Sequence, residues 1–192
     1  MDDKYDRLYQ IAEDQAGYFT AEQARQVGFT YERLSANTSN NRFIRMDQGI
    51  YRLNHFPATL YEDLFAAWLR TGPDSVISHH SALSVYELSD YLPNEIHVIV
   101  PRTASRRREN LQLHTHQIAG DEITRRAGLP VTTPARTIAD VANSGLSREF
   151  VIQALDEALQ RGLTTKEDLL DQAERRGGRA KEIIRSYFRS RG

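Results

Sequence analysis

The histidines of this chain are the residues whose types and spacing come closest to a metal-binding pattern. His114 and His116 are two residues apart in a segment with alternating apolar residues, so both would lie on one face of a strand, at a spacing that a metal site can use. His79 and His80 form the other close pair. The sequence has no cysteine, and no carboxylate has a diagnostic offset such as that in His-Glu-x-x-His. We therefore expect exposed strand histidines, with neither a metal nor a cofactor.

Motifs for nucleophilic catalysis and for nucleotide binding are missing from the sequence. It contains no Gly-x-Ser-x-Gly motif, which would indicate a hydrolase, and no Gly-x-x-x-x-Gly-Lys motif, which would indicate a phosphate-binding loop. The pair Gly177-Gly178 alone is too weak a signal for a phosphate site. The sequence predicts a protein that is not an enzyme.

A different chemistry, hydrogen bonding to DNA, is indicated by polar and basic residues between positions 30 and 48. Asn, Ser and Thr side chains hydrogen-bond to base edges, and Arg side chains also bind phosphates. The predicted contact residues are Thr30, Tyr31, Arg33, Ser35, Asn37, Thr38, Arg42, Arg45 and Gln48. For Arg45 and Arg52 an alternative stays open, because ion pairs with acids of the first helix could pin this segment instead.

Three short predicted helices would hold in place the contact residues between 30 and 38. The spacing of apolar residues predicts a helix over 4–14, and Thr20 then stands as an N-cap with Gln23 three residues later, as in a capping box. Thr30 caps a further helix over 31–38, with Leu34 facing the core. The side chains expected to face outward from this helix are those of Arg33, Ser35 and Asn37. We interpret 31–38 as a recognition helix.

A hairpin follows the predicted recognition helix. Residues 42–46 and 50–53 are two alternating segments, and the turn between them, 47–49, contains Gly49. Two helices followed by such a hairpin indicate a winged helix-turn-helix.

The rest of the chain predicts a second domain with both helices and strands. A boundary is expected near Pro57, after which Thr59 would cap a helix with Leu60 and Phe65 on its apolar face. Further expected elements are a strand at 76–77, a helix over 78–88, strands at 96–100, 111–118 and 125–131, a helix starting at Pro134 with Thr133 as its cap, and helices over 147–160, 165–175 and 179–189. The predicted class is α+β, with a winged helix-turn-helix domain over 1–57 and a mixed α/β domain over 58–192 that ends in a helical bundle.

Two blocks of the sequence resemble the AbiEi-type antitoxin family. The first block comprises Gly28-Phe29-Thr30, Leu34, Phe43, Arg45 and Gly49-Ile50-Tyr51-Arg52-Leu53, and the second His80-Ser81-Ala82-Leu83, residues 94–101 and residues 129–140. The resemblance implies a transcriptional autoregulator whose winged domain binds double-stranded DNA at repeats in its own promoter. It also implies a partner, a nucleotidyltransferase-like toxin encoded beside it in a phage-defence operon.

The recognition helix and the wing are less basic than is usual in that family. Residues 35–41 carry no Lys or Arg, and the wing tip has Asp47-Gln48. Because each neutralised phosphate adds to the release of counterions from DNA, we expect weaker binding with a less steep salt dependence than in a basic relative.

Composition limits where DNA could bind and where the protein would be found. The chain of 192 residues has a formal net charge of -1, so any DNA-binding surface must be local. The absence of cysteine fits a reducing compartment, and no apolar run reaches membrane-spanning length. We expect a cytoplasmic protein, and the chain does not indicate whether it binds DNA as a monomer or as a dimer.

Two further basic clusters are secondary candidates for phosphate contact. One comprises Arg102, Arg106, Arg107 and Arg108 in a predicted loop, and the other comprises basic residues between 175 and 191. Both have a plain alternative, because loop tips and terminal helices need a solvated surface.

Two functions therefore remain open. The first is a sequence-specific DNA-binding antitoxin and autorepressor. The second is an interaction module that binds a toxin or another protein with little or no specific DNA binding.

Overall fold

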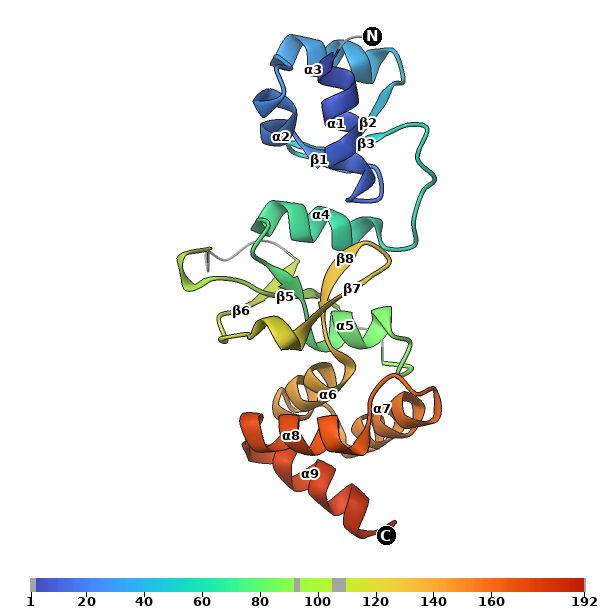
Figure 1. Cartoon of the computed structure of the whole chain (residues 1–192), viewed down its shortest axis with the longest axis vertical. Helices are drawn as coiled ribbons and strands as arrows, with labels where there is room; N and C mark the ends of the chain where they lie inside the picture. Colours follow the sequence, from blue (N-terminus) through green and yellow to red (C-terminus); the bar gives the residue numbers. More distant parts are fainter. Residues whose placement is uncertain (1–2, 92–93, 105–109, 192) are drawn as a thin grey trace. The chain divides into compact units, whose positions relative to one another are not determined.

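The computed structural model describes residues 3–91, 94–104 and 110–191, and its contacts divide the chain into two units (Figure 1). The N-terminal unit comprises Met1–Pro73 with Ala127–Leu129, and the C-terminal unit comprises Asp74–Arg126 with Pro130–Gly192. Within the described residues, no helix has both the length and the apolar character needed to cross a membrane.

The N-terminal unit is a winged helix-turn-helix, as predicted. Its elements are α1 (Asp3–Glu13), β1 (Tyr18–Thr20), α2 (Ala21–Gln26), α3 (Tyr31–Ser39), β2 (Phe43–Asp47), β3 (Ile50–Leu53) and α4 (Glu62–Thr71). The strands form an antiparallel sheet in the order β1-β3-β2. Strand β1 was not predicted; its three residues pair with β3, Tyr18 opposite Arg52 and Thr20 opposite Ile50.

Aromatic side chains form much of the core of this unit. The ring of Phe43 lies 5.0 Å from that of Phe19 and 5.9 Å from that of Phe29, between ring centroids. Leu8 of α1 and Leu34 of α3 are buried in the same cluster. This core therefore joins α1, the turn before α3, and the wing.

Helix α4 begins later than predicted. Thr59 does not cap it, because the Thr59 hydroxyl accepts a hydrogen bond from the Tyr61 backbone N–H (3.1 Å) and the helix starts at Glu62. Leu60, predicted for the apolar face, is 97% exposed for the same reason.

Helix α4 also lies beyond the predicted domain boundary at residue 57, yet it packs on the winged helix-turn-helix. The Phe65 ring stacks on Tyr18 of β1 at 4.7 Å between centroids. Arg70 of α4 pairs with Asp47 of the wing at 3.3 Å. These contacts explain why α4 belongs to the N-terminal unit.

The C-terminal unit combines a mixed sheet with a helical end. Its elements are β4 (Val76–Ile77), α5 (His79–Val85), β5 (Ile96–Ile99), η1 (Arg102–Ala104), β6 (Leu111–His114), η2 (Gly120–Glu122), β7 (Ile123–Arg126), β8 (Leu129–Thr132), α6 (Pro134–Asn143), α7 (Arg148–Gln160), α8 (Lys166–Arg176) and α9 (Gly178–Arg189). The sheet order is β6-β5-β4-β8-β7, in which β4 is antiparallel to β5 while β4–β8 and β5–β6 are parallel. Helices α6, α8 and α9 pack together at the end drawn in orange and red in Figure 1. The predicted α+β class is confirmed.

Two of the predicted strands differ from the structure. The segment 111–118 is a strand only as far as His114, and 125–131 is not one strand but the hairpin of β7 and β8. The turn of that hairpin places Ala127 and Gly128 at positive φ, which interrupts an extended segment.

A buried arginine joins three elements of the C-terminal unit. Arg136 of α6 is 1% exposed and donates to Glu122 of η2 (2.5 Å) and to Asp140 (2.8 Å) one helical turn later. Arg176 of α8 approaches the second oxygen of Asp140 at 3.1 Å. Burial raises the pKa of the Asp140 carboxyl, and the charges of Arg136 and Arg176 oppose this rise. The network thus contains two cations and two anions in the interior.

We predict that Arg136→Ala strongly destabilises the C-terminal unit. Removing one partner of a buried ion pair costs about 3–5 kcal/mol in the free energy of unfolding. Here Glu122 would lose its cation, and Asp140 would keep only Arg176. Urea unfolding followed by circular dichroism measures this loss. Arg175→Ala is the matched control, because Arg175 makes exposed ion pairs with Asp121 and Asp171. Equal stability of the two variants would contradict the prediction.

Candidate nucleic-acid interface

Helix α3 is held at its start by a side-chain cap. The Thr30 hydroxyl accepts a hydrogen bond from the Arg33 backbone N–H at 3.2 Å, as the sequence predicted. The turn between α2 and α3 contains Gly28, whose φ of 95° suits glycine. Leu34 is 1% exposed, which fixes the buried side of α3.

The exposed side of α3 carries several of the predicted DNA-contact residues. Tyr31 is 61% exposed, and Arg33 and Ser35 are exposed as well. The guanidinium of Arg25, from the last turn of α2, lies 5.3 Å from the centre of the Tyr31 ring. Arg25 was not among the predicted contact residues, although its position in the last turn of α2 indicates a cation close to the start of α3.

Two of the predicted arginines lie beside the same tyrosine. Arg33 of α3 and Arg42, which precedes β2, approach the Tyr5 ring to 5.8 Å and 5.7 Å from its centre. Cations at this distance from a ring are attracted by its negative face. The structure therefore brings two charges that are nine positions apart in the chain to one patch, which we call the Tyr5 patch.

Asn37 does not face outward as predicted. It is 4% exposed, its side-chain oxygen accepts from the Tyr5 hydroxyl (3.0 Å), and its side-chain nitrogen donates to the Arg33 carbonyl (2.7 Å). Position 37 lies three residues after the buried Leu34 and so falls on the same side of the helix. Thr38 is half-buried, and its hydroxyl donates to the Leu34 carbonyl (2.9 Å).

The wing exposes Arg45 and Gln48. Asp47, the acid at its tip, forms the ion pair with Arg70 of α4, so its charge is balanced within the N-terminal unit. Arg45 donates to the Asp47 carbonyl at 3.4 Å. Arg52 is buried and pairs with Glu62 of α4 at 3.9 Å, rather than with an acid of α1 as the alternative supposed.

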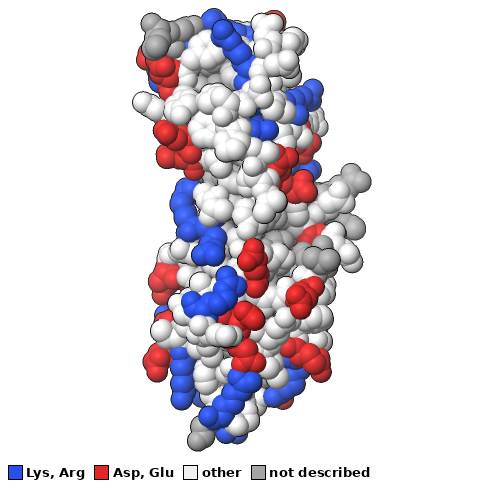
Figure 2. Space-filling view, turned by 90° about the vertical axis from the view of Figure 1, so that its right-hand side faces the viewer, with Lys and Arg blue, Asp and Glu red and all other residues white. Residues whose placement is uncertain are grey.

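The structure describes the two secondary basic clusters, the candidates for phosphate contact, to different extents. Arg102 is exposed in η1, whereas Arg106, Arg107 and Arg108 lie outside the described residues. Most cations between 175 and 191 have partners within the C-terminal unit: Arg175, Arg176, Lys181, Arg185 and Arg191 form ion pairs, and Arg179 donates to two backbone carbonyls. On the face drawn in Figure 2, basic and acidic side chains alternate along the molecule. These partners favour the plain interpretation of the C-terminal cluster.

The histidines are placed differently from the prediction. His116 is exposed, but His114 is half-buried, and its ring stacks on that of His79 at 3.6 Å between centroids. Burial, together with the charges of neighbouring histidines, lowers the pKa of His97 to about 3 and that of His114 to about 4. The expectation of exposed strand histidines is therefore wrong for His114, because β5 and α5 bring other histidines against it.

Each of the two units contains a segment that matches a known protein family. Residues 75–187 match the family described as AbiEi antitoxin C-terminal domain, and residues 6–54 match the family described as Transcriptional regulator, AbiEi antitoxin. The chain belongs to the AbiEi antitoxin family. The resemblance predicted from the two sequence blocks is confirmed.

A solved structure shares the fold of this AbiEi-family chain. The crystal structure of the RV2827C protein from Mycobacterium tuberculosis aligns with a TM-score of 0.56 over 96% of this chain and 77% of that chain, at 14% sequence identity. A comparison with curated proteins gives no match.

We predict that Asn37→Ala destabilises the N-terminal unit instead of removing a DNA contact. The substitution leaves the Tyr5 hydroxyl without its partner, and loss of a partner in a buried hydrogen bond costs about 1–3 kcal/mol. Trp68, the only tryptophan in the sequence, lies in α4 of this unit, so its fluorescence follows unfolding there. Ser35→Ala, on the exposed side of the same helix, should unfold like the wild type. An unchanged unfolding midpoint for Asn37→Ala would show that its side chain is not needed in the core.

Proposed function

We propose that this chain is a DNA-binding antitoxin that represses its own promoter and counteracts a nucleotidyltransferase-like toxin, acting as a regulator and not as an enzyme. The observation that chiefly supports this proposal is the exposed side of α3. Tyr31, Arg33 and Ser35 are exposed there, while Leu34 of the same helix is buried in the core. Membership of the AbiEi family supports the toxin as a partner.

The arrangement of the N-terminal unit suits the usual docking of a helix-turn-helix. In that geometry the N-terminal residues of the recognition helix contact base edges in the major groove. Here those residues are Tyr31, Glu32 and Arg33. We assign base contact to Arg33 and Ser35, because Arg pairs with guanine and Ser hydrogen-bonds to several bases.

Phosphate contacts would come from cations that flank α3. Arg25 lies on one side beside Tyr31, and Arg42 lies in the Tyr5 patch. Arg45 and Gln48 of the wing are exposed and available to the adjacent backbone. Because Arg70 balances Asp47, the acid at the wing tip opposes DNA less than its place in the sequence suggests. The few cations still limit the steepness of the salt dependence.

We predict that Arg33→Ala and Arg42→Ala impair DNA binding in different ways. The wild type should prefer a duplex from upstream of its own gene to a scrambled duplex. Arg33→Ala should lose about 1–3 kcal/mol and much of that preference, as expected for a base contact. Arg42→Ala should weaken binding to both duplexes alike and reduce the slope of log K against log salt by about 1, as expected for a phosphate contact. Fluorescence anisotropy at several salt concentrations measures both effects.

Arg189→Ala is the control for net charge, because Arg189 is exposed on α9 of the C-terminal unit. An equal loss in this variant would mean that binding follows total charge and not the surface of α3. A wild type without preference for the upstream duplex would contradict autorepression and favour the interaction module.

Neutralisation of a toxin is tested separately. Cells that express the toxin gene encoded beside this one should stop growing, and we expect co-expression of this chain to restore growth. Arrested growth despite abundant, folded antitoxin would contradict the antitoxin role, while leaving the result on DNA intact.

A further inference from the structure

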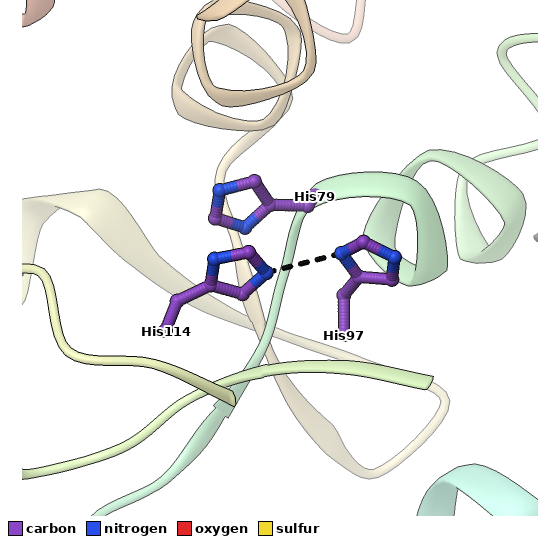
Figure 3. Close-up of side chains that lie close together, drawn as sticks. All are labelled: His79, His97 and His114. Atoms are coloured by element: carbon purple, nitrogen blue, oxygen red, sulfur yellow. Dashed lines mark hydrogen bonds between the residues drawn. The ribbon is translucent and has the colours of Figure 1, made fainter. Parts of the chain in front are cut away.

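Three histidine rings from three elements converge in the C-terminal unit (Figure 3). They are His79 at the start of α5, His97 in β5 and His114 at the end of β6. One ring nitrogen of each lies within 4.8 Å of those of the other two. We call this group the three-histidine cluster.

Backbone contacts fix the positions from which the three rings project. The Ser78 N–H donates to the His97 carbonyl (3.0 Å), and the His97 N–H donates to the Ser81 hydroxyl (2.9 Å), which ties α5 to β5. Strand β6 pairs with β5, and the Val100 N–H donates to the His114 carbonyl (2.8 Å). The cluster is therefore built on paired strands and a helix start rather than on a loose loop.

The spacing of the ring nitrogens suits one small metal ion. Nδ1 of His97 and Nε2 of His114 are 3.0 Å apart. Two nitrogens bound to a tetrahedral zinc ion at about 2.0–2.1 Å lie about 3.3 Å from each other. An ion would thus replace the hydrogen bond between these two rings. The His79 ring is nearly parallel to that of His114, with 10° between the planes, so it would have to tilt for its nitrogen to join them.

The outer nitrogens of two of these rings already have partners. The Ser78 hydroxyl lies 3.0 Å from Nδ1 of His79, and Nδ1 of His80 lies 3.3 Å from Nε2 of His97. These contacts leave Nε2 of His79 and Nδ1 of His97 for a shared ion. Metal-binding histidines commonly have such a second partner, which sets the tautomer and the ring orientation.

The backbone of His79 has an uncommon conformation, which it shares with five other non-glycine residues of the described chain. Its φ is 47°, a left-handed conformation that is uncommon outside glycine, and its side chain is 2% exposed. Strained residues of this kind cluster at binding sites, where the surrounding structure maintains them. Here the strain directs an imidazole against two others.

We propose that the three-histidine cluster binds one divalent transition-metal ion, of which zinc is the representative, through His79, His97 and His114. Three neutral imidazole nitrogens are a common donor set for zinc. His97 and His114 are half-buried, so solvent reaches the cluster and water could fill a fourth position. The site lies in the C-terminal unit and does not depend on DNA binding by α3.

A second donor set in the same region fits less well. His79, His116 and Asp140 also bring one ligand atom each within 4.8 Å of one another. However, Asp140 already pairs with Arg136 and approaches Arg176. A metal ion there would have to displace these cations or lie beside them, which the repulsion between like charges opposes.

The test is a titration of zinc into the full chain after its metals have been removed with EDTA, against a competing chromophoric chelator. We expect one zinc ion per chain. His97→Gln and His114→Gln should each weaken binding by more than about 100-fold, and His80→Gln by roughly 10–100-fold, as for loss of an outer partner. His116→Gln should bind zinc like the wild type.

Absence of stoichiometric binding in the wild type would overturn the proposal, and so would unchanged binding in His97→Gln and His114→Gln. Loss of binding in His116→Gln would assign the ion to the second donor set instead. A substituted histidine can also disturb folding, so the wild type provides an independent measurement. In NMR spectra of the histidine rings, zinc should shift the signals of His79, His97 and His114 directly, whereas His55 in the N-terminal unit should not respond.

Discussion

The contact among Phe19, Phe29 and Phe43 is the interaction on which the proposed DNA-binding surface depends. These rings come from β1, from the turn before α3 and from the first position of β2, and Phe43 contacts both of the others. Helices α2 and α3 have only six and nine residues. Isolated helices shorter than about 12–15 residues are marginal in water, so packing must hold these two in place. Burial of each phenylalanine contributes about 1.5–3 kcal/mol. The same contact links the turn before α3 to the wing.

The charges of this protein are balanced by nearby partners, and the formal net charge of the chain is only -1. The chain has 25 basic and 26 acidic residues, and many of the cations are satisfied by acids or carbonyls of the same unit. In the N-terminal unit, the guanidinium groups of Arg33 and Arg42 lie 5.8 Å and 5.7 Å from the centre of the Tyr5 ring. The gathering of Arg25, Arg33 and Arg42 beside α3 is the electrostatic basis for proposing that DNA binds the N-terminal unit.

Several features set by local sequence were predicted, although the expected Thr59 cap was not found, and features that depend on pairing between distant segments were missed. The capping box of Thr20 with Gln23 and the cap of Thr30 follow from residue types within one turn, and both are present. Strand β1 was missed because its three residues become a strand only by pairing with β3. Asn37 was misplaced although its spacing from Leu34 puts it on the buried side of α3, where it meets Tyr5, 32 residues away. The three-histidine cluster could not be found from spacing, since parallel pairing of β5 with β6 brings His97 and His114 together.

The central claim is that α3 and the wing form the surface that reads DNA. Its most direct test is a titration of the upstream duplex into isotope-labelled full-length protein, followed by backbone amide NMR. We expect the largest shifts in Tyr31–Ser39 and in the β2–β3 hairpin. Shifts concentrated in the C-terminal unit, or none at a duplex excess, would contradict it.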